Sequence, residues 1–414
     1  MPTLLSHNPF RYDRLPDDSA FFDREEEVGR IVKSITKGEN LLVRGLRRMG
    51  KTSCLLRAAR TAANEHNAVT FFADLRRYAT LADLAQGLLS NAVPALGSLG
   101  ARASTWLAST VKGILLKPAA KGSLNSSALG GPDLEVELSL EVKAAPAAVQ
   151  VRTFTDVLDA LNTLAGEQKK PVAVILDEFT FLDEMGLGAD KASWQLRSTI
   201  QRHQHITYIL AASSRHLIDR LHGSEGPFYG MFGRLEVKAI DPVRFSGWID
   251  SQFVLAGITA DRIGETCIRL VGERTRDILQ LARRCFDLAA PSAAATPTTV
   301  EAALASLIED SDSEFFDLWA PLAPLKKTIL RIISDQGGTA DFTAATIAPY
   351  GLHVSSSIGQ ACRDLMRMRS TGFDNRTPFI LRISEHPAKY TFDNPFFAAW
   401  VKRLEQARPY TRNA

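Results

Sequence analysis

The sequence predicts an α/β fold, a parallel sheet covered by helices, and three observations support this prediction. Between Leu41 and Val243, short apolar runs alternate with longer segments of helical character. The runs are apolar at consecutive positions, which is typical of strands buried on both faces. A glycine-rich turn joins the first run to a helix. The predicted strands are LLVRG, AVTFFADL, VAVILDEF, ITYILAAS and LEVKAI.

Composition limits the classes of function. With 414 residues, 45% hydrophobic and 23% charged, the chain is typical of soluble globular proteins with two or three domains. Its net charge of +3 is small, so contact with nucleic acid would require a local basic patch. The four cysteines lack CxxC spacing and fit neither a zinc site nor a disulfide framework. No signal-like segment and no run of roughly 20 apolar residues occurs, so we expect a cytoplasmic protein and no membrane contact.

Changes in pattern divide the chain into three predicted domains. The sheet core takes residues 1–243, an all-helical lid takes 244–312, and a third domain takes 313–414. An insertion at about 96–151 interrupts the core with the Gly/Ser-rich stretch SLNSSALGGPD. Apolar and polar residues then alternate from Leu134 to Lys143, which predicts a half-exposed strand. The insertion is either a loop packed on its own domain or a surface for self-assembly or another protein.

The third domain follows the element order of a winged helix. The expected order is three helices (LKKTILRIISDQ, TAATIAPYG and SSSIGQACRDLMRMRSTG), a two-stranded ribbon, and the closing helix FFAAWVKRL. A modest basic patch could bind duplex DNA, or be a solvated face of a domain packed on its own core; it comprises Arg363, Arg367, Arg369, Arg376 and Arg382. The helical spacing of Phe396, Phe397 and Trp400 predicts core packing.

The strongest motif is G-x-x-x-x-G-K-[ST] between the first strand and a helix. Glycines in this loop let successive N–H groups point at phosphate oxygens, beside the positive end of the helix. We expect Lys51 to bridge the β and γ phosphates of ATP and Thr52 to supply a hydroxyl ligand to Mg²⁺. The predicted phosphate-binding residues are Gly45, Leu46, Arg47, Arg48, Met49, Gly50, Lys51, Thr52 and Ser53.

Acidic residues follow a second buried strand, VAVILDEF. Because parallel strands end at the same edge of a sheet, this pair should lie beside the phosphate loop. Asp177 is the predicted second metal residue, and Glu178 the predicted general base for the attacking water. A third strand ends in Ser213 and Ser214, either of which could orient that water, with Ser214 as the predicted catalytic residue.

At these residues the chain resembles the archaeal-type ATPases, a branch of the AAA+ and STAND P-loop proteins that is also similar to origin-recognition initiators. The resemblance rests on FFDREEEVGRI, GLRRMGKTS, ILDEF, LAASS, FYGMFGRLEVKAIDP and YTFDNPFFAAW, and excludes the insertion. It implies an AAA+-like P-loop NTPase core with a parallel sheet, a helical lid and a C-terminal winged-helix domain. Serines replace the asparagine frequent at the end of the third strand, which implies slow hydrolysis.

The resemblance also implies roles for arginines outside the loop. Arg24, with Glu25, would lie near the adenine pocket. Arg234 would be an arginine finger for a neighbouring subunit, unless it pairs with Glu236 or another carboxylate. Arg276 would be the lid arginine that senses the nucleotide, with Arg274 as its competitor.

Two functions remain open at this point. One is a regulatory ATP-dependent switch that forms homo-oligomers and acts on a separate effector protein in defence or signalling. The alternative is a DNA-binding initiator or transposition-type ATPase that assembles on duplex DNA. A nucleotide-binding scaffold without hydrolysis is disfavoured, because Glu178 is present.

Overall fold

The computed structural model divides the chain into two compact units. The core unit takes Asp17–Lys238, and the C-terminal unit takes Ala239–Ala414 together with Met1–Pro16. The structure describes residues 8–12, 21–95, 116–118, 136–138, 146–187, 190–213, 218, 221–289, 294–353, 356–368, 378–385 and 388–407. Among these residues, every helix is too short or too polar to span a bilayer.

The core unit is built on a five-stranded sheet in the order β2-β5-β6-β1-β7. Every pairing in it is parallel, as predicted. The strands are β1 (Leu41–Arg44), β2 (Val69–Asp74), β5 (Val172–Asp177), β6 (Ile206–Ala212) and β7 (Gly233–Glu236). Strand β6 lies between β1 and β5, so the two strands that carry the main motifs are second neighbours.

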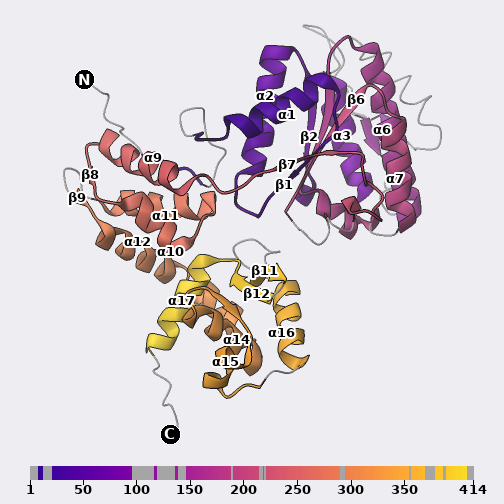
Figure 1. The fold of residues 1–414 in the computed structure, drawn as a ribbon. Coiled ribbons are helices and arrows are strands. Elements are labelled where there is room, and N and C mark those ends of the chain that lie inside the picture. The colour runs from indigo at the N-terminus through magenta and orange to yellow at the C-terminus, as the bar shows by residue number, and fades with distance from the viewer. Residues whose placement is uncertain are drawn as a thin grey trace. The chain divides into compact units, whose positions relative to one another are not determined.

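Helices cover both faces of this sheet (Figure 1). Helices α1 (Glu25–Lys37) and α2 (Lys51–His66) pack on each other along one face. The other face carries α3 (Leu81–Ala95), α6 (Ala147–Glu167) and α7 (Asp190–Arg202). Short helical turns η1 (Leu75–Arg77), η3 (Phe179–Leu182) and η4 (Asp183–Leu187) follow β2 and β5.

Burial explains which apolar runs form the central strands. All residues of β5 and β6 are buried, as their consecutive apolar residues predict. Of the run LEVKAI, predicted as a buried strand, only Leu235 and Glu236 lie in a strand, and both are half-buried. Strand β7 starts earlier, at Gly233, ends at Glu236, and leaves Gly233 and Arg234 exposed. It pairs only with β1 among the described strands, and an edge strand has one side open to solvent.

The predicted insertion contributes one small hairpin to the described residues. Strand β3 (Leu116–Pro118) pairs antiparallel with β4 (Val136–Leu138), Leu116 opposite Leu138. Strand β4 falls within the predicted alternating stretch and lies beside α3. Helix α6 begins at Ala147, earlier than the predicted end of the insertion. The Gly/Ser-rich stretch SLNSSALGGPD of the predicted insertion lies outside the described residues.

The lid part of the C-terminal unit is helical, as the sequence predicts. It contains α9 (Pro242–Leu255), α10 (Ile263–Val271), α11 (Thr275–Leu288) and α12 (Pro297–Asp310), with a short parallel pair of β8 (Thr259–Ala260) and β9 (Ala294–Ala295). The N-terminal residue Phe10 is fully buried, with its ring 5.4 Å from that of Phe253. The predicted core domain began at residue 1, and the structure corrects this boundary because Phe10 completes an aromatic cluster of the lid.

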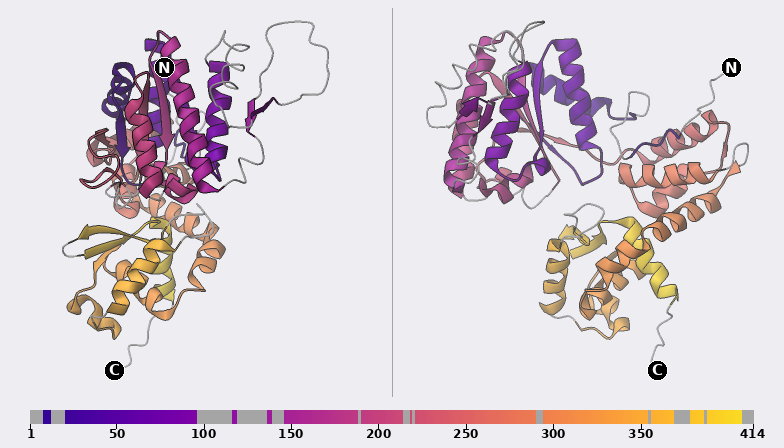
Figure 2. Two further views of the ribbon diagram at one scale, coloured as in Figure 1. Left: turned by 90° about the vertical axis from the view of Figure 1, so that its right-hand side faces the viewer. Right: turned by 180° about the vertical axis from the view of Figure 1, so that it is seen from behind.

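The last part of the chain combines helices with a small antiparallel sheet (Figure 2). After α13 (Asp312–Trp319) come α14 (Pro324–Asp335), β10 (Thr339–Asp341), α15 (Ala344–Ile347), η5 (Ala348–Tyr350), α16 (Ser356–Arg367), β11 (Ile380–Glu385), β12 (Ala388–Phe392) and α17 (Pro395–Ala407). The sheet order is β10-β12-β11, and β10 was not predicted. Phe396, Phe397 and Trp400 are at most 5% exposed, which confirms their predicted core role.

Candidate functional site

The phosphate loop connects the end of β1 to the start of α2. Gly45 has no room for a side chain, because a Cβ there would lie 2.5 Å from the carbonyl oxygen of Val237. Gly50 has a φ of +90°, which favours glycine, and directly precedes α2. Helix α2 starts without a side-chain cap, so its first N–H groups remain for an anion. The local sequence thus builds a loop suited to phosphate.

Lys51 is held inside this loop. Its Nζ donates to the carbonyl oxygens of Gly45 and Leu46, each at 3.0 Å. The residue is 5% exposed, and burial lowers the pKa of its ammonium, while the charges of Glu178 and Asp177 oppose that shift. A triphosphate would bring the negative charge that favours the protonated lysine. Arg47, Arg48, Met49, Thr52 and Ser53 lie in the same loop and first helical turn, with Arg48 at a φ of +67°.

Thr52 and Asp177 meet although 125 residues separate them. The Thr52 hydroxyl donates to Oδ2 of Asp177 at 2.5 Å, and Oδ1 accepts from the N–H of Glu178 at 2.9 Å. Asp177 is fully buried, and this burial raises the pKa of its carboxyl, against the hydrogen bond from Thr52. A hydroxyl beside a buried carboxylate is a donor set that fits Mg²⁺, which takes few protein ligands and adds phosphate oxygens and water.

A wholly protein-built metal centre is not found. Within the part of the chain that the structure describes, no three His, Cys, Asp or Glu side chains group so as to hold a metal ion. The cysteines Cys54, Cys267, Cys285 and Cys362 are buried and unlinked, and burial raises the pKa of each thiol.

Glu178 adopts an unusual backbone conformation. Its φ of +53° lies in the left-handed region, which costs a non-glycine residue of order 1–3 kcal/mol. The Ser213 hydroxyl, at the end of β6, donates to Oε2 of Glu178 at 2.8 Å. The strained turn therefore directs the carboxylate of Glu178 towards β6. Ser214, the serine predicted as catalytic, lies outside the described residues.

Arg24 supports the phosphate loop from α1. Its guanidinium donates to the carbonyl oxygen of Met49 at 3.0 Å and pairs with Glu27 at 2.7 Å. The residue is 5% exposed, so the pair is shielded from solvent. The sequence resemblance placed Arg24 near the adenine. In the structure it holds the loop backbone, a role that no local spacing reveals because 25 residues separate the two groups.

The remaining predicted arginines lie at separate places. Arg234 is exposed on β7, and its guanidinium donates to the carbonyl oxygen of His222 at 3.0 Å. Glu236 pairs with Arg44 at 3.1 Å. Arg276 is half-buried in the first turn of α11. Its predicted competitor Arg274 is buried and forms an ion pair of 3.0 Å with Asp393, at the end of β12.

Sequence reasoning missed an ion pair at the nucleotide edge of the sheet. Asp74 ends β2 and lies directly beside Asp177 in the parallel register. Arg76 follows in η1, and its Nη2 lies 2.9 Å from Oδ2 of Asp74. Asp74 could have been predicted at this site, because it ends a third predicted strand and the carboxyl ends of parallel strands lie at one edge of the sheet.

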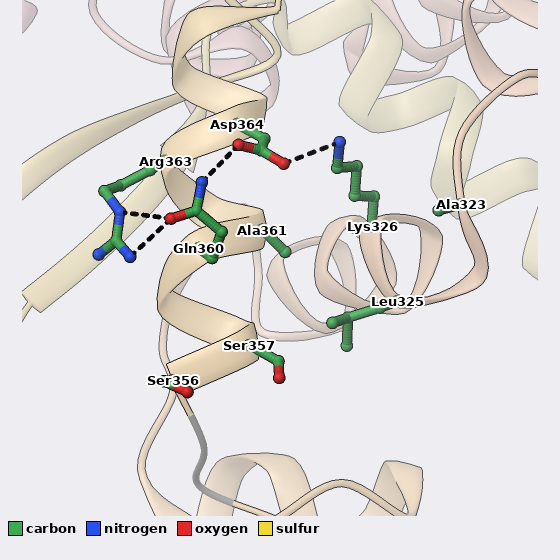
Figure 3. Close-up of a pocket in the computed structure, with 9 residues that line it drawn as sticks. All are labelled: Ala323, Leu325, Lys326, Ser356, Ser357, Gln360, Ala361, Arg363 and Asp364. Atoms are coloured by element: carbon green, nitrogen blue, oxygen red, sulfur yellow. Dashed lines mark hydrogen bonds and ion pairs between the residues drawn. The ribbon is translucent and has the colours of Figure 1, made fainter.

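A second candidate surface lies between α14 and α16 (Figure 3). Lys326 and Asp364 pair across this groove at 3.1 Å, and Gln360 links Asp364 to Arg363. The contact with Lys326 lowers the pKa of the Asp364 carboxyl. Arg363 and Arg367 are exposed on α16 and Arg382 on β11, whereas Arg369 and Arg376 lie outside the described residues.

Comparison with known proteins identifies a family for the core unit. Residues 21–246 match the model of an ATPase domain predominantly from Archaea, over more than half of the chain. No curated protein sequence matches.

Among solved structures, the Walker-type ATPase paby2304 of Pyrococcus abyssi is similar over 95% of this chain and 99% of its own, with a TM-score of 0.58 and 17% identity. The Aeropyrum pernix ORC2 protein, solved as ADPNP-ADP complexes, is similar over 97% of this chain and 98% of its own, with a TM-score of 0.53 and 14% identity. These likenesses establish an α/β P-loop ATPase fold. By its family match, the chain belongs to the family of ATPase domains found predominantly in Archaea, as its motifs predict.

Proposed function

We propose that this protein binds ATP with Mg²⁺ at the carboxyl edge of the core sheet, hydrolyses it slowly, and uses the cycle to switch conformation or assembly state. The observation that supports this most strongly is the convergence of groups from three strand ends. Lys51 and Thr52 follow β1, Asp177 and Glu178 follow β5, and Ser213 follows β6, with contacts of 2.5 Å and 2.8 Å joining them. Such convergence is what hydrolysis of a bound triphosphate requires.

In the proposed reaction each side chain has one task. Lys51 exchanges its bonds to the Gly45 and Leu46 carbonyls for phosphate oxygens, and Thr52 and Asp177 would hold Mg²⁺. Mg²⁺, when bound, offsets the charge of the β and γ phosphates. Ser213 holds the Glu178 carboxylate in the nucleotide-free state, and Glu178 accepts a proton from the attacking water once it leaves that bond. Release of the Ser213 bond before each turnover gives a reason for slow hydrolysis.

Switching would follow from the arginines outside the loop. Arg276 of the lid would sense the γ phosphate, and Arg234 on the exposed edge strand β7 would reach the nucleotide of a neighbouring subunit. This scheme requires a homo-oligomer in the ATP state. A separate effector protein in defence or signalling would then read the change of assembly.

The catalytic part is tested by phosphate release from wild type and Glu178→Gln. We expect release to fall by about 10²–10⁴-fold in the variant, because a general base contributes that much. Binding of ATP should persist, since glutamine keeps the shape of the side chain. Equal release from both proteins would refute the assignment of Glu178.

A second candidate function is assembly on duplex DNA through the C-terminal domain. It is favoured by the exposed Arg363 and Arg367 on α16, the third helix of the winged-helix order, and by Arg382 on the hairpin β11–β12. Mass photometry with and without ATP and a duplex separates the two functions. Assembly with ATP alone supports the protein switch, whereas assembly that needs DNA and weakens with salt supports the initiator-type function.

A further inference from the structure

The ion pair between Asp74 and Arg76 has a defined geometry at the edge of the proposed nucleotide site. Oδ1 of Asp74 accepts from Nε of Arg76 at 3.0 Å, and Oδ2 accepts from Nη2 at 2.9 Å. The backbone N–H of Arg76 also donates to Oδ1, at 3.1 Å. A carboxylate that accepts two parallel bonds fixes the plane of a guanidinium. The orientation of Arg76 is therefore set by Asp74.

This pair stands next to the acidic residues of the site. Asp74 and Asp177 are register partners on adjacent parallel strands, which lie about 4.8 Å apart. Turn η1, which carries Arg76, contacts η3, which begins one residue after Glu178. The carboxylates of Asp74, Glu178 and Asp177 all help to raise the pKa of the Arg76 guanidinium.

The charge of Arg76 also reaches the phosphate loop. Burial is the main cause of the lowered pKa of Lys51, and the charges of Arg47 and Arg76 add to it. In the sheet, β5 with Asp177 lies between β2 and β1. Arg76, in the turn after β2, and Lys51, at the end of the loop after β1, therefore lie on opposite sides of the acidic residues. The Arg76 side chain is 40% exposed, so an incoming phosphate can reach it without opening the core.

The bond donors that remain on Arg76 suit a phosphate. The pair with Asp74 uses the Nε–Nη2 edge of the guanidinium, and the two N–H donors of Nη1 lie outside this edge. A phosphate oxygen can bind Nη1 while the pair stays intact. Because the β-phosphate would bind the loop after β1, a group in the turn after β2 would be closer to the distal end of the nucleotide.

We propose that Arg76 is a second cation of the nucleotide site, which binds the terminal phosphate of ATP from the β2 side and is held in place by Asp74. This proposal rests on the proposed ATPase function. It differs from the role of Arg234, since Arg76 acts within its own subunit. It predicts that Arg76 distinguishes ATP from ADP, because ADP lacks the phosphate that Arg76 contacts.

The test measures the dissociation constants of ATP and ADP by calorimetry with Mg²⁺, in a Glu178→Gln background that prevents turnover. Arg76→Gln should weaken ATP binding by about 10-fold or more, the value of a hydrogen bond to a charged group. Its ADP binding should stay within about twofold. Arg76→Lys should recover part of the ATP affinity, because it keeps the charge and loses the two parallel bonds to Asp74.

Arg77→Gln is the matched control, an exposed arginine in the same short helix. It should bind both nucleotides like the parent protein. Equal weakening of ATP and ADP by Arg76→Gln, or unchanged ATP binding in that variant, would overturn the role of Arg76 and leave the ATPase function intact. Absence of ATP binding in the parent protein itself would refute the proposed function, and this inference with it.

Discussion

Polar side chains cluster at both ends of the core strands, here called the amino edge and the carboxyl edge of the sheet. The two clusters differ in the groups that their side chains pair with. At the amino edge, His203 joins the hydroxyl of Tyr208 to the carboxylate of Asp159, with 2.7 Å on either side. The His203 side chain is 2% exposed, and burial raises the pKa of Tyr208 well above its usual value. Both ring nitrogens of the histidine are thus used inside the fold.

At the carboxyl edge, the partners are groups that a ligand can replace. Lys51 donates to backbone carbonyls, and Asp177 accepts from Thr52. The backbone of Glu178 has a positive φ, a strained conformation that a carboxylate with a purely structural role does not require. Hydrogen-bond satisfaction alone therefore does not separate structural from functional polar groups in this sheet. Strain, and partners that could be exchanged for phosphate or metal, mark the edge that binds.

The largest expected difference comes from the same isosteric change at both edges. Asp177→Asn should lower ATP hydrolysis by about 10²-fold or more, because it removes the charge that would hold Mg²⁺. It should not lower the free energy of unfolding, because the amide oxygen can accept from the N–H of Glu178 while the amide NH2 donates to the Thr52 hydroxyl, and no buried charge remains. Asp159→Asn, the control at the amino edge, should leave hydrolysis unchanged and reduce stability, which urea unfolding measures. Equal hydrolysis by the two variants would contradict the distinction between the edges.

The buried His222 extends the comparison to the pH dependence of stability. His222 packs among Phe179, Phe228 and Phe232, and within the described residues its Nε2 has no hydrogen-bond partner. Burial, and next the charge of Arg234, lowers its pKa to about 4 from 6.5. Between these values the unfolded chain binds a proton that the folded chain does not, so stability falls as pH falls through this window.

His222 should lower the free energy of unfolding by about 3 kcal/mol at pH 4, and should not change it above pH 6.5. Urea unfolding of wild type and His222→Phe across pH 4–7.5 measures it, and the variant should lack this part of the slope. A variant with the full slope would show that other groups cause the pH dependence.

The smallest expected effect concerns the strained turn. Glu178→Gly should raise the free energy of unfolding by about 1 kcal/mol, because glycine adopts a positive φ without strain. Glu26→Gly, in the first turn of α1, should lower it by up to about 1 kcal/mol, because glycine disfavours helix. Chemical denaturation of both proteins at pH 7.5 gives the two signs. A loss of stability in Glu178→Gly would show that the Ser213 bond outweighs the backbone strain.

The sequence predicted the sheet and the main site residues because their signals are local. The phosphate loop is a contiguous motif, and buried strands that end in Asp177 and Glu178 must reach the edge where that loop lies. Which of two adjacent serines meets Glu178 was not predictable, because the left-handed turn at Glu178 decides where its carboxylate points. The structure brings Ser213 to it.

Contacts between residues distant in sequence account for what prediction missed. Arg24 binds the carbonyl of Met49, and Arg274 pairs with Asp393 across 119 residues, where no periodicity or motif carries a signal. Phe10 joins the lid for the same reason. The burial of β7 was predicted incorrectly because Leu235 and Val237 are typical of a central strand. Its position at the edge of the sheet is set by the topology, which these residues do not reveal.

The most direct test is calorimetry of Mg²⁺·ATP binding to wild type and Lys51→Ala. Wild type should bind, and the variant should lose about 10²-fold or more in affinity, because a cation in a shielded loop contributes several kcal/mol to phosphate binding. The variant should unfold at the same or a higher urea concentration, since a buried ammonium is removed. Unchanged affinity in Lys51→Ala, or no binding to folded wild type, would refute the binding of ATP at the phosphate loop.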